Sequence, residues 1–154
     1  MPEADEALLR QAIALSRRSR EQGDHPFGAL VADARGYVIA EALNAHSKSP
    51  LEHAEVSALR TATMHTCASD LAGATLYSSA EPCAMCAGAL YWSGIRRVVY
   101  ALSERRLLDL TGDDPRNPTL SLPCREVFAR GQRPIAVLGP LLEDEAAEVH
   151  RDFW

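Results

Sequence analysis

The chain has 154 residues, 47% of them hydrophobic, and a formal net charge of −5. This is the composition of an ordinary globular protein, and the length suits one domain over residues 1–154. The sequence holds no apolar run long enough to span a membrane, and its acidic start, MPEADEALLR, lacks the basic-then-apolar order of a signal peptide. We therefore expect a cytoplasmic protein with no membrane partner. Its negative charge also argues against a nucleic-acid partner, because such binders usually carry a basic stripe.

The first half of the chain predicts a helix, a hairpin and a second helix. Apolar residues recur at helical spacing over residues 4–20. Two short apolar runs, 29–32 and 37–42, flank a turn that contains glycine, which is the pattern of a β-hairpin. The alanine-rich stretch 53–64 is compatible with a helix.

The second half predicts alternating strands and helices. Strands are predicted at residues 74–78, 97–101 and 134–138. A helix is predicted from Pro82 to Trp92. Residues 142–153 carry an apolar stripe at helical spacing. The turn-rich segment 109–120 is either an active-site cover or a surface connection. This order of elements predicts a three-layer α/β domain with a mixed sheet.

Two short motifs carry the chemistry, His53-Ala54-Glu55 and Pro82-Cys83-Ala84-Met85-Cys86. His53, Cys83 and Cys86 supply three zinc ligands, and three protein ligands leave the open fourth position that distinguishes a catalytic zinc from a structural one. We therefore expect one catalytic Zn²⁺ per chain. Water at the open position loses a proton near neutral pH, and Glu55 is free to carry protons. The combination matches the H-x-E…P-C-x-x-C signature of zinc deaminases.

The remaining cysteines and histidines have less specific spacing. Cys83 and Cys86 are three apart at the start of a predicted helix, so both thiols can point the same way, and the helix dipole there favours thiolates. Cys67 follows His53 at a distance of roughly 20 Å if the intervening segment is helical, so we expect a packing residue, and Cys124 suits a buried free thiol. Surface or hydrogen-bonding roles are expected for the other histidines, His25, His46, His65 and His150.

From residue 25 to about residue 101 the chain resembles the cytidine deaminase superfamily, in its nucleobase and tRNA adenosine deaminase branch. The segments that match are HPFGALV, ALNAHS, HAEVSALR and LYSSAEPCAMCAGALYWSGIRRVVY. The resemblance implies a cytidine deaminase-like α/β/α fold with a five-stranded mixed sheet, a catalytic zinc and a homodimer. It also implies hydrolysis in which zinc-activated water attacks an amino-bearing ring carbon while Glu55 shuttles protons.

The same resemblance implies a set of substrate contacts. It places Asn44 against the edge of the base and the backbone N–H of Ala54 at a ring carbonyl or nitrogen. Phe27 would help to wall the pocket or belong only to the core, and Trp92 is a further candidate. Asp114 lies in a segment similar to the Asp-Asp stretch of guanine deaminases, where a carboxylate accepts purine N–H groups. A solvent-facing turn is the alternative for Asp114.

The identity of the substrate stays open between several hypotheses. HPFGA and ALYWSGIRRVVY look most like bacterial guanine deaminases, which favours conversion of guanine to xanthine and ammonia. Cytosine, an amino-triazine such as ammeline, or a nucleoside are alternatives, as is a tRNA-specific adenosine deaminase that flips out its target base. A non-catalytic zinc or redox-binding domain is the remote alternative, since C-x-x-C serves both chemistries. The terminal Phe153 and Trp154 would either close over the pocket or pack on a neighbouring helix.

Overall fold

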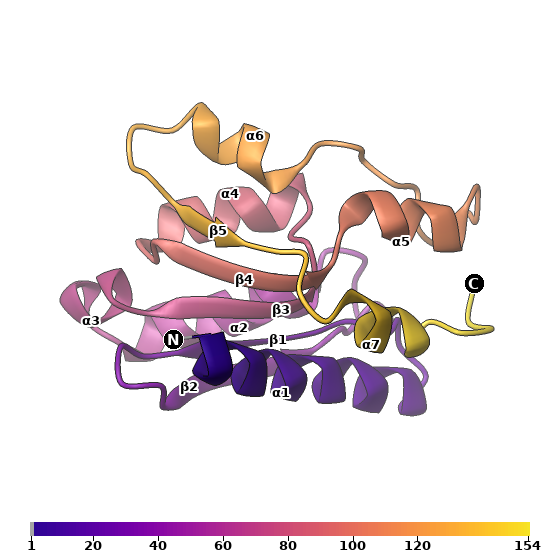
Figure 1. Ribbon diagram of the computed structural model, residues 1–154, viewed down its shortest axis with the longest axis horizontal. Helices are drawn as coiled ribbons and strands as arrows, with labels where there is room; N and C mark the ends of the chain where they lie inside the picture. The colour runs from indigo at the N-terminus through magenta and orange to yellow at the C-terminus, as the bar shows by residue number, and fades with distance from the viewer. Residues whose placement is uncertain (1) are drawn as a thin grey trace.

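The computed structural model describes residues 2–154 and contains a five-stranded sheet in the order β2-β1-β3-β4-β5 (Figure 1). Strand β1 pairs antiparallel with β2 and β3, whereas β3, β4 and β5 run parallel. The predicted mixed sheet is therefore confirmed. The strand bounds are β1 Gly28–Ala32, β2 Val38–Leu43, β3 Thr75–Ala80, β4 Arg97–Leu102 and β5 Ala136–Leu138.

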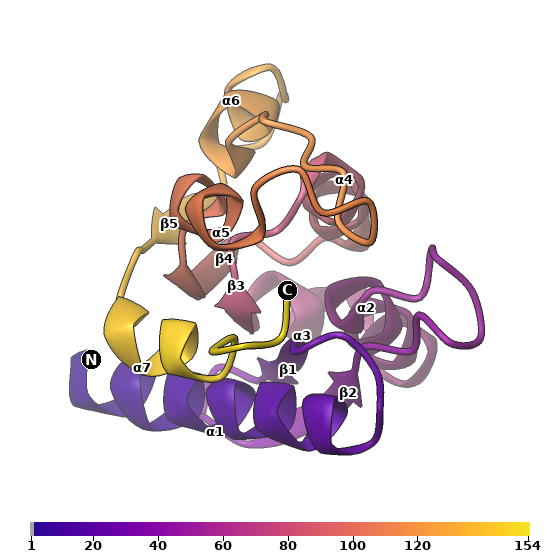
Figure 2. The same ribbon diagram turned by 90° about the vertical axis from the view of Figure 1, so that its right-hand side faces the viewer.

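Helices cover both faces of the sheet, as expected for three layers (Figure 2). One face carries α1 and α7, and the other carries α2 and α4. Three further short helices, α3, α5 and α6, were not predicted from the sequence. The helix bounds are α1 Pro2–Glu21, α2 Ala54–His65, α3 Ala68–Ala72, α4 Ala84–Ser93, α5 Glu104–Thr111, α6 Cys124–Ala129 and α7 Glu143–Glu148.

The last predicted helix is shorter than the apolar stripe over 142–153 suggested. Helix α7 ends at Glu148, and the chain continues through turns to the C-terminus. His150 is buried there, and its ring accepts a hydrogen bond from the indole N–H of Trp154. The tail therefore folds back by side-chain contacts instead of continuing as a helix.

The core lies on both sides of the sheet, and β1 shows why. All five of its residues are buried. Ala29 and Val31 contribute to the core beneath α2 and α4, whereas Leu30 and Ala32 contribute to the core beneath α1. Alternate residues of a strand point to opposite faces, so a strand covered on both faces is apolar throughout.

Gly28 allows α1 to pack close to the sheet. A Cβ atom built on Gly28 would lie 2.5 Å from both the Leu15 Cβ and the Ser16 backbone nitrogen. Any larger residue would therefore push α1 away from β1. Among the helices of residues 2–154, none is both long and apolar enough to cross a bilayer.

Candidate active site

The ends of two helices bring three metal-ligating side chains together. His53 immediately precedes α2, Cys83 immediately precedes α4, and Cys86 is the third residue of α4. The His53 Nδ1 atom lies 3.5 Å from the Sγ atoms of both Cys83 and Cys86. All three ligand atoms lie within 4.8 Å of one another. Residues far apart in the chain thus form one compact set of donors.

This donor set fits a zinc ion. Tetrahedral bonds of about 2.0 Å to nitrogen and about 2.3 Å to sulfur would separate a ligating nitrogen and sulfur by roughly 3.6 Å, close to the 3.5 Å between His53 Nδ1 and either sulfur. Hydrogen bonding with Cys86 and His53 lowers the pKa of the Cys83 thiol to about 4. The same interaction and burial raise the pKa of Cys86. This environment therefore favours ionisation of Cys83, and the thiolate is the form of cysteine that binds metals.

Glu55 supplies a carboxyl group beside the donors. Its position on the first turn of α2 leaves it buried at 6% exposure, and it lines the same cavity as His53 and Cys83. Burial, reinforced by the charge of Cys83, raises the pKa of Glu55 to about 7. A carboxyl group with such a pKa can both take up and release a proton near neutral pH.

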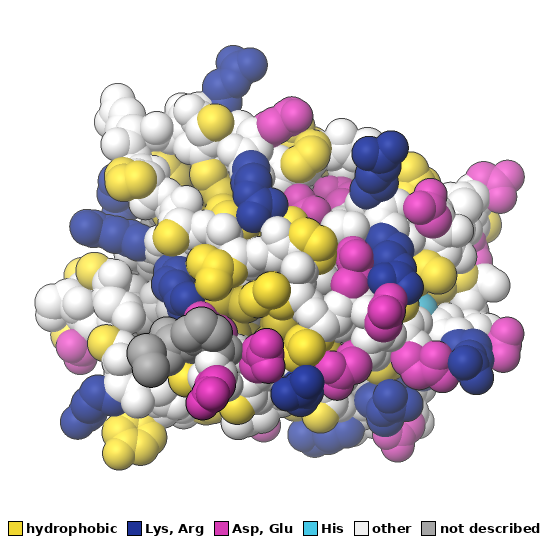
Figure 3. All heavy atoms as spheres, in the orientation of Figure 1, with side chains coloured by type: hydrophobic (Ala, Val, Ile, Leu, Met, Phe, Trp, Pro, Cys, Tyr) yellow, Lys and Arg dark blue, Asp and Glu magenta, His cyan; other side chains and the backbone are white. Residues whose placement is uncertain are grey.

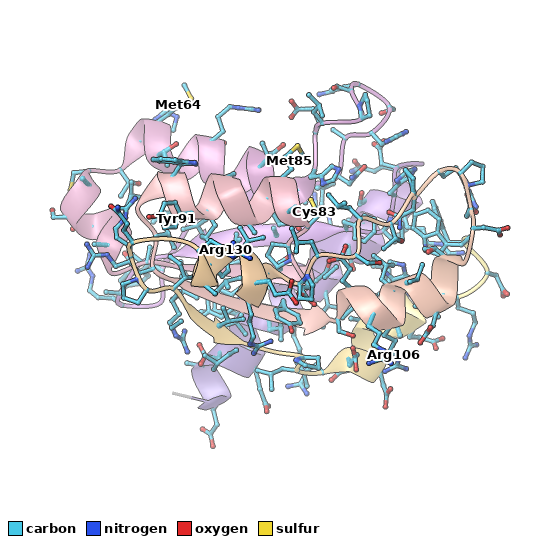
Figure 4. The ribbon with its side chains drawn as sticks, turned by 90° about the horizontal axis from the view of Figure 1, so that it is seen from above. Met64, Cys83, Met85, Tyr91, Arg106 and Arg130 are labelled. Atoms are coloured by element: carbon cyan, nitrogen blue, oxygen red, sulfur yellow. The ribbon has the colours of Figure 1, made fainter. Side chains whose placement is uncertain are left out.

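The cavity has a volume of about 330 Å³, and its lining includes residues at or just after the carboxyl ends of β3 and β4. Figure 2 views the sheet from the side on which these strands end. We call one side the motif wall; it consists of Phe27, Asn44, His53, Glu55 and Cys83. We call the other side the loop wall; it consists of Glu104 and Leu107 from α5 and residues 116–120 from the connection to α6. Figure 4 shows Cys83 at the end of α4 that faces α5, with Tyr91 at the opposite end of that helix.

Two of the expected substrate contacts, Asn44 and Phe27, lie at the motif wall, and a third, Ala54, lies between two residues of that wall in the chain. Asn44 is buried there, and its Oδ1 accepts a hydrogen bond from the His46 backbone N–H at 2.8 Å. The group that Asn44 can offer to a bound base is therefore its Nδ2 amide. Phe27 also lines the cavity. Ala54 is the buried first residue of α2, where backbone N–H groups have no partner within the helix.

The other two expected contacts lie elsewhere. Trp92 comes six residues after Cys86, about 9 Å further along α4, so it lies away from the metal-ligating side chains. Its side chain is 80% exposed. Asp114 forms an ion pair of 2.7 Å with Arg116, and that arginine, not Asp114, reaches the cavity. The structure thus does not bring Trp92 or Asp114 to the pocket.

Some residues of the pocket were missed by the sequence reasoning. His25 and His46 both line the cavity, with their rings stacked at 4.2 Å between centroids. Phe153 and Trp154 pack edge-on against His25, behind the cavity lining. The terminal aromatics therefore support the pocket from behind, which is closer to the packing hypothesis than to a lid. His25 lies two residues before Phe27 in the sequence, and only this closeness could have indicated that His25 lines the cavity.

Glu81 connects the two walls. One of its carboxylate oxygens accepts the backbone N–H of Glu104 at 3.0 Å, and the other accepts that of Cys124 at 2.9 Å. Glu81 thereby fixes the starts of α5 and α6, between which the loop wall lies. Cys124 is buried as expected. Cys67 is exposed and precedes α3, so the prediction of a packing residue was wrong there.

Comparisons with known proteins agree with this geometry. Residues 2–102 match the family described as the cytidine and deoxycytidylate deaminase zinc-binding region. A probable cytosine deaminase of Schizosaccharomyces pombe is 41% identical, over 100% of this chain and 94% of the relative. A tRNA-specific adenosine deaminase of Haemophilus influenzae is 36% identical over 66% of this chain and 60% of the relative. The structure of guanine deaminase from Nitrosomonas europaea superposes with a TM-score of 0.77 at 31% identity, covering 96% of this chain and 83% of that one.

Proposed function

The chain belongs to the cytidine and deoxycytidylate deaminase family, and from this premise we propose that it is a zinc-dependent deaminase of a free nucleobase. The family resemblance expected from the sequence is confirmed, and the chain is a hydrolase acting on C–N bonds. The observation that carries the proposal is a 330 Å³ cavity in which Glu55 accompanies the three metal-ligating side chains. This volume is at the lower end of the range for small-molecule sites.

The proposed roles follow from what each side chain can do in the cavity. His53, Cys83 and Cys86 hold the zinc, which when bound acts as a Lewis acid and lowers the pKa of water. Glu55 accepts the proton that water gives up as its oxygen bonds to the amino-bearing ring carbon. Glu55 passes this first proton to the ring nitrogen. It then takes the second proton from the same oxygen and passes it to the amino group, so that the C–N bond breaks and water and the base become the oxo-base and ammonia. Asn44 donates its amide N–H to an acceptor on the base and holds the ring in place.

Guanine is our first candidate for the substrate, and cytosine is the second. The fold of the whole chain is similar to that of a guanine deaminase, and the shared motifs HPFGA and ALYWSGIRRVVY favour the same base. The full-length relative that is a probable cytosine deaminase favours the second. Both bases are flat rings that present an amino-bearing carbon beside a ring nitrogen, which is the unit that the motif wall can process.

A tRNA substrate receives less support from the surface. Binding of nucleic acid depends on clustered basic side chains. On the face drawn in Figure 3, basic side chains are interspersed with acidic ones, and the chain carries a formal charge of −5. Residues 116–120 also cover one side of the cavity. We infer that this loop restricts the approach of a flipped nucleotide to Glu55.

We also propose that two copies of the chain associate through the face formed by α2 and α4. Large apolar side chains lie exposed there, with Met64 on α2 at 70% exposure and Trp92 on α4 at 80%. Figure 4 shows Met64 and Met85 along this side. Light scattering of the intact chain tests the proposal, because Trp92→Glu should turn a dimer into a monomer, whereas the exposed Tyr37→Glu should not.

The activity itself is tested by ammonia release from zinc-loaded protein with guanine, cytosine, ammeline, adenine, cytidine, guanosine and adenosine. We expect strong turnover of one free base and little turnover of the matching nucleoside. If adenosine-containing tRNA anticodon stem-loops were deaminated while every free base was left unchanged, the proposed substrate class would be wrong.

A further inference from the structure

Glu104 on the loop wall has a carboxyl oxygen that lacks a partner. Its backbone N–H is held by Glu81, and its side chain lines the cavity from the first turn of α5. The Oε2 atom is buried, yet within residues 2–154 no hydrogen-bond donor reaches it. Since a buried acceptor without a donor costs about 1–3 kcal/mol, such a group at a cavity wall is suited to a donor that arrives with a ligand.

Burial and two neighbouring negative charges make the charged form of Glu104 unfavourable. Burial, together with the charges of Glu81 and Cys83, raises the pKa of Glu104 to about 8. Both carboxyl oxygens of Glu81 are already used at the starts of α5 and α6, so Glu81 cannot take the place of Glu104. A ligand N–H that donates to Glu104 would relieve the unfavourable burial of this group.

We infer that Glu104 selects free bases over nucleosides by accepting the N–H of the ring nitrogen that carries the sugar in a nucleoside. The inference rests on the proposed function and names its specificity residue. The reacting carbon of the base must face Glu55 and the metal-ligating side chains on the motif wall. In cytosine the glycosidic nitrogen lies opposite the reacting carbon, and in guanine it lies on the second ring, away from it. In this orientation that nitrogen points away from Glu55, and we assign its N–H to the Oε2 atom of Glu104, which no donor reaches within residues 2–154.

A nucleoside cannot satisfy this arrangement. Its glycosidic nitrogen has a carbon in place of hydrogen, so Glu104 would stay without a donor and would face the bulk of the sugar. Sites built to hydrogen-bond one N–H group discriminate strongly against ligands that lack it, because the buried polar group is then left unpaired. Asp114 was expected to accept base N–H groups, but it is occupied by Arg116. Glu104 is the carboxyl group of the cavity wall that has a buried oxygen without a hydrogen-bond partner among residues 2–154.

The test compares each free base with a methylated analogue that lacks the critical N–H. Cytosine and 1-methylcytosine, or guanine and 9-methylguanine, are assayed with the wild type, Glu104→Ala and Glu104→Gln, all loaded with zinc. We expect Glu104→Ala to lower kcat/KM for the free base by about 10- to 100-fold, mainly through KM, and to change kcat/KM for the methylated base by less than about threefold. Glu104→Gln keeps the shape and one carbonyl acceptor, so its loss should be intermediate.

The control is Asp109→Asn, which removes one negative charge from an exposed position of the same helix and should leave both substrates unaffected. Zinc content and thermal unfolding show whether each variant is folded and loaded. Equal losses for the free and the methylated base in both Glu104 variants would overturn this inference while leaving the proposed function intact. A wild-type protein that deaminates no free base would overturn both.

Discussion

The two walls of the pocket are built in different ways. The motif wall is formed by short motifs at the starts of α2 and α4, where His53, Glu55 and Cys83 lie within two residues of a helix end. The loop wall depends on long-range contacts, because Glu81 fixes the starts of α5 and α6 and the C-terminal tail accepts a hydrogen bond from Arg116. The difference suggests a division of labour, with the reaction chemistry on the wall built from local motifs and the choice of substrate on the wall held by tertiary contacts.

Loss of a metal ligand should have the largest effect on the motif wall. Cys86→Ser removes a buried sulfur donor, and the two ligands that remain do not make a catalytic zinc site. We expect the zinc content measured by mass spectrometry to fall from one ion per chain to nearly none, with turnover lost. Cys67→Ser, at an exposed thiol outside the site, should retain both. Retention of zinc and activity by Cys86→Ser would show that the donor set has been assigned wrongly.

Glu55→Gln should separate metal binding from proton transfer on the same wall. The amide keeps the size of the side chain but cannot accept and release a proton, and general acid–base catalysis contributes about 10²- to 10⁴-fold. We expect kcat to fall by that factor while the zinc content is unchanged. Glu41→Gln on the exposed side of β2 serves as the matched control. Full activity of Glu55→Gln would show that Glu55 is not the group that carries protons in the reaction.

The same division explains which features could be predicted from the sequence. His53 and Cys83 belong to local motifs next to helix starts, and the spacing of such motifs is visible in one dimension. Glu104 and Arg116 reach the cavity only because Glu81 and the C-terminal tail position their segments. Such tertiary contacts leave no periodic pattern. Short helices such as α6, with six residues, depend on the same contacts, since brief segments have little helical stability of their own.

Arg116→Ala tests whether the loop wall acts on binding more than on chemistry. The guanidinium group pairs with Asp114, donates to the Phe153 carbonyl oxygen at 2.9 Å and lies over the rings of Phe153 and Trp154. Without it, the loop loses its tie to the tail. We expect KM to rise about tenfold and kcat to change by less than about threefold. Arg105→Ala on the exposed side of α5 should change neither, and a fall confined to kcat would contradict the division between the walls.

The smallest effect concerns the tail behind the loop wall and depends on pH. Burial and the charge of Arg20 lower the pKa of His150 to about 4, from an ordinary value near 6.5. Between these two values the unfolded chain binds more protons than the folded one, so the free energy of unfolding must fall as the pH falls.

The linkage predicts a loss of about 2 kcal/mol between pH 7 and pH 5 from His150 alone. Denaturant titrations of His150→Gln should show a weaker dependence on pH by that amount, and the exposed His65→Gln should follow the wild type. Parallel curves for all three proteins would mean that His150 stays solvated. Protonation of His150 in the folded protein, which requires a pH near 4, also removes the acceptor for the Trp154 indole N–H, so the tail that supports His25 and Phe27 should loosen as the pH falls toward that value.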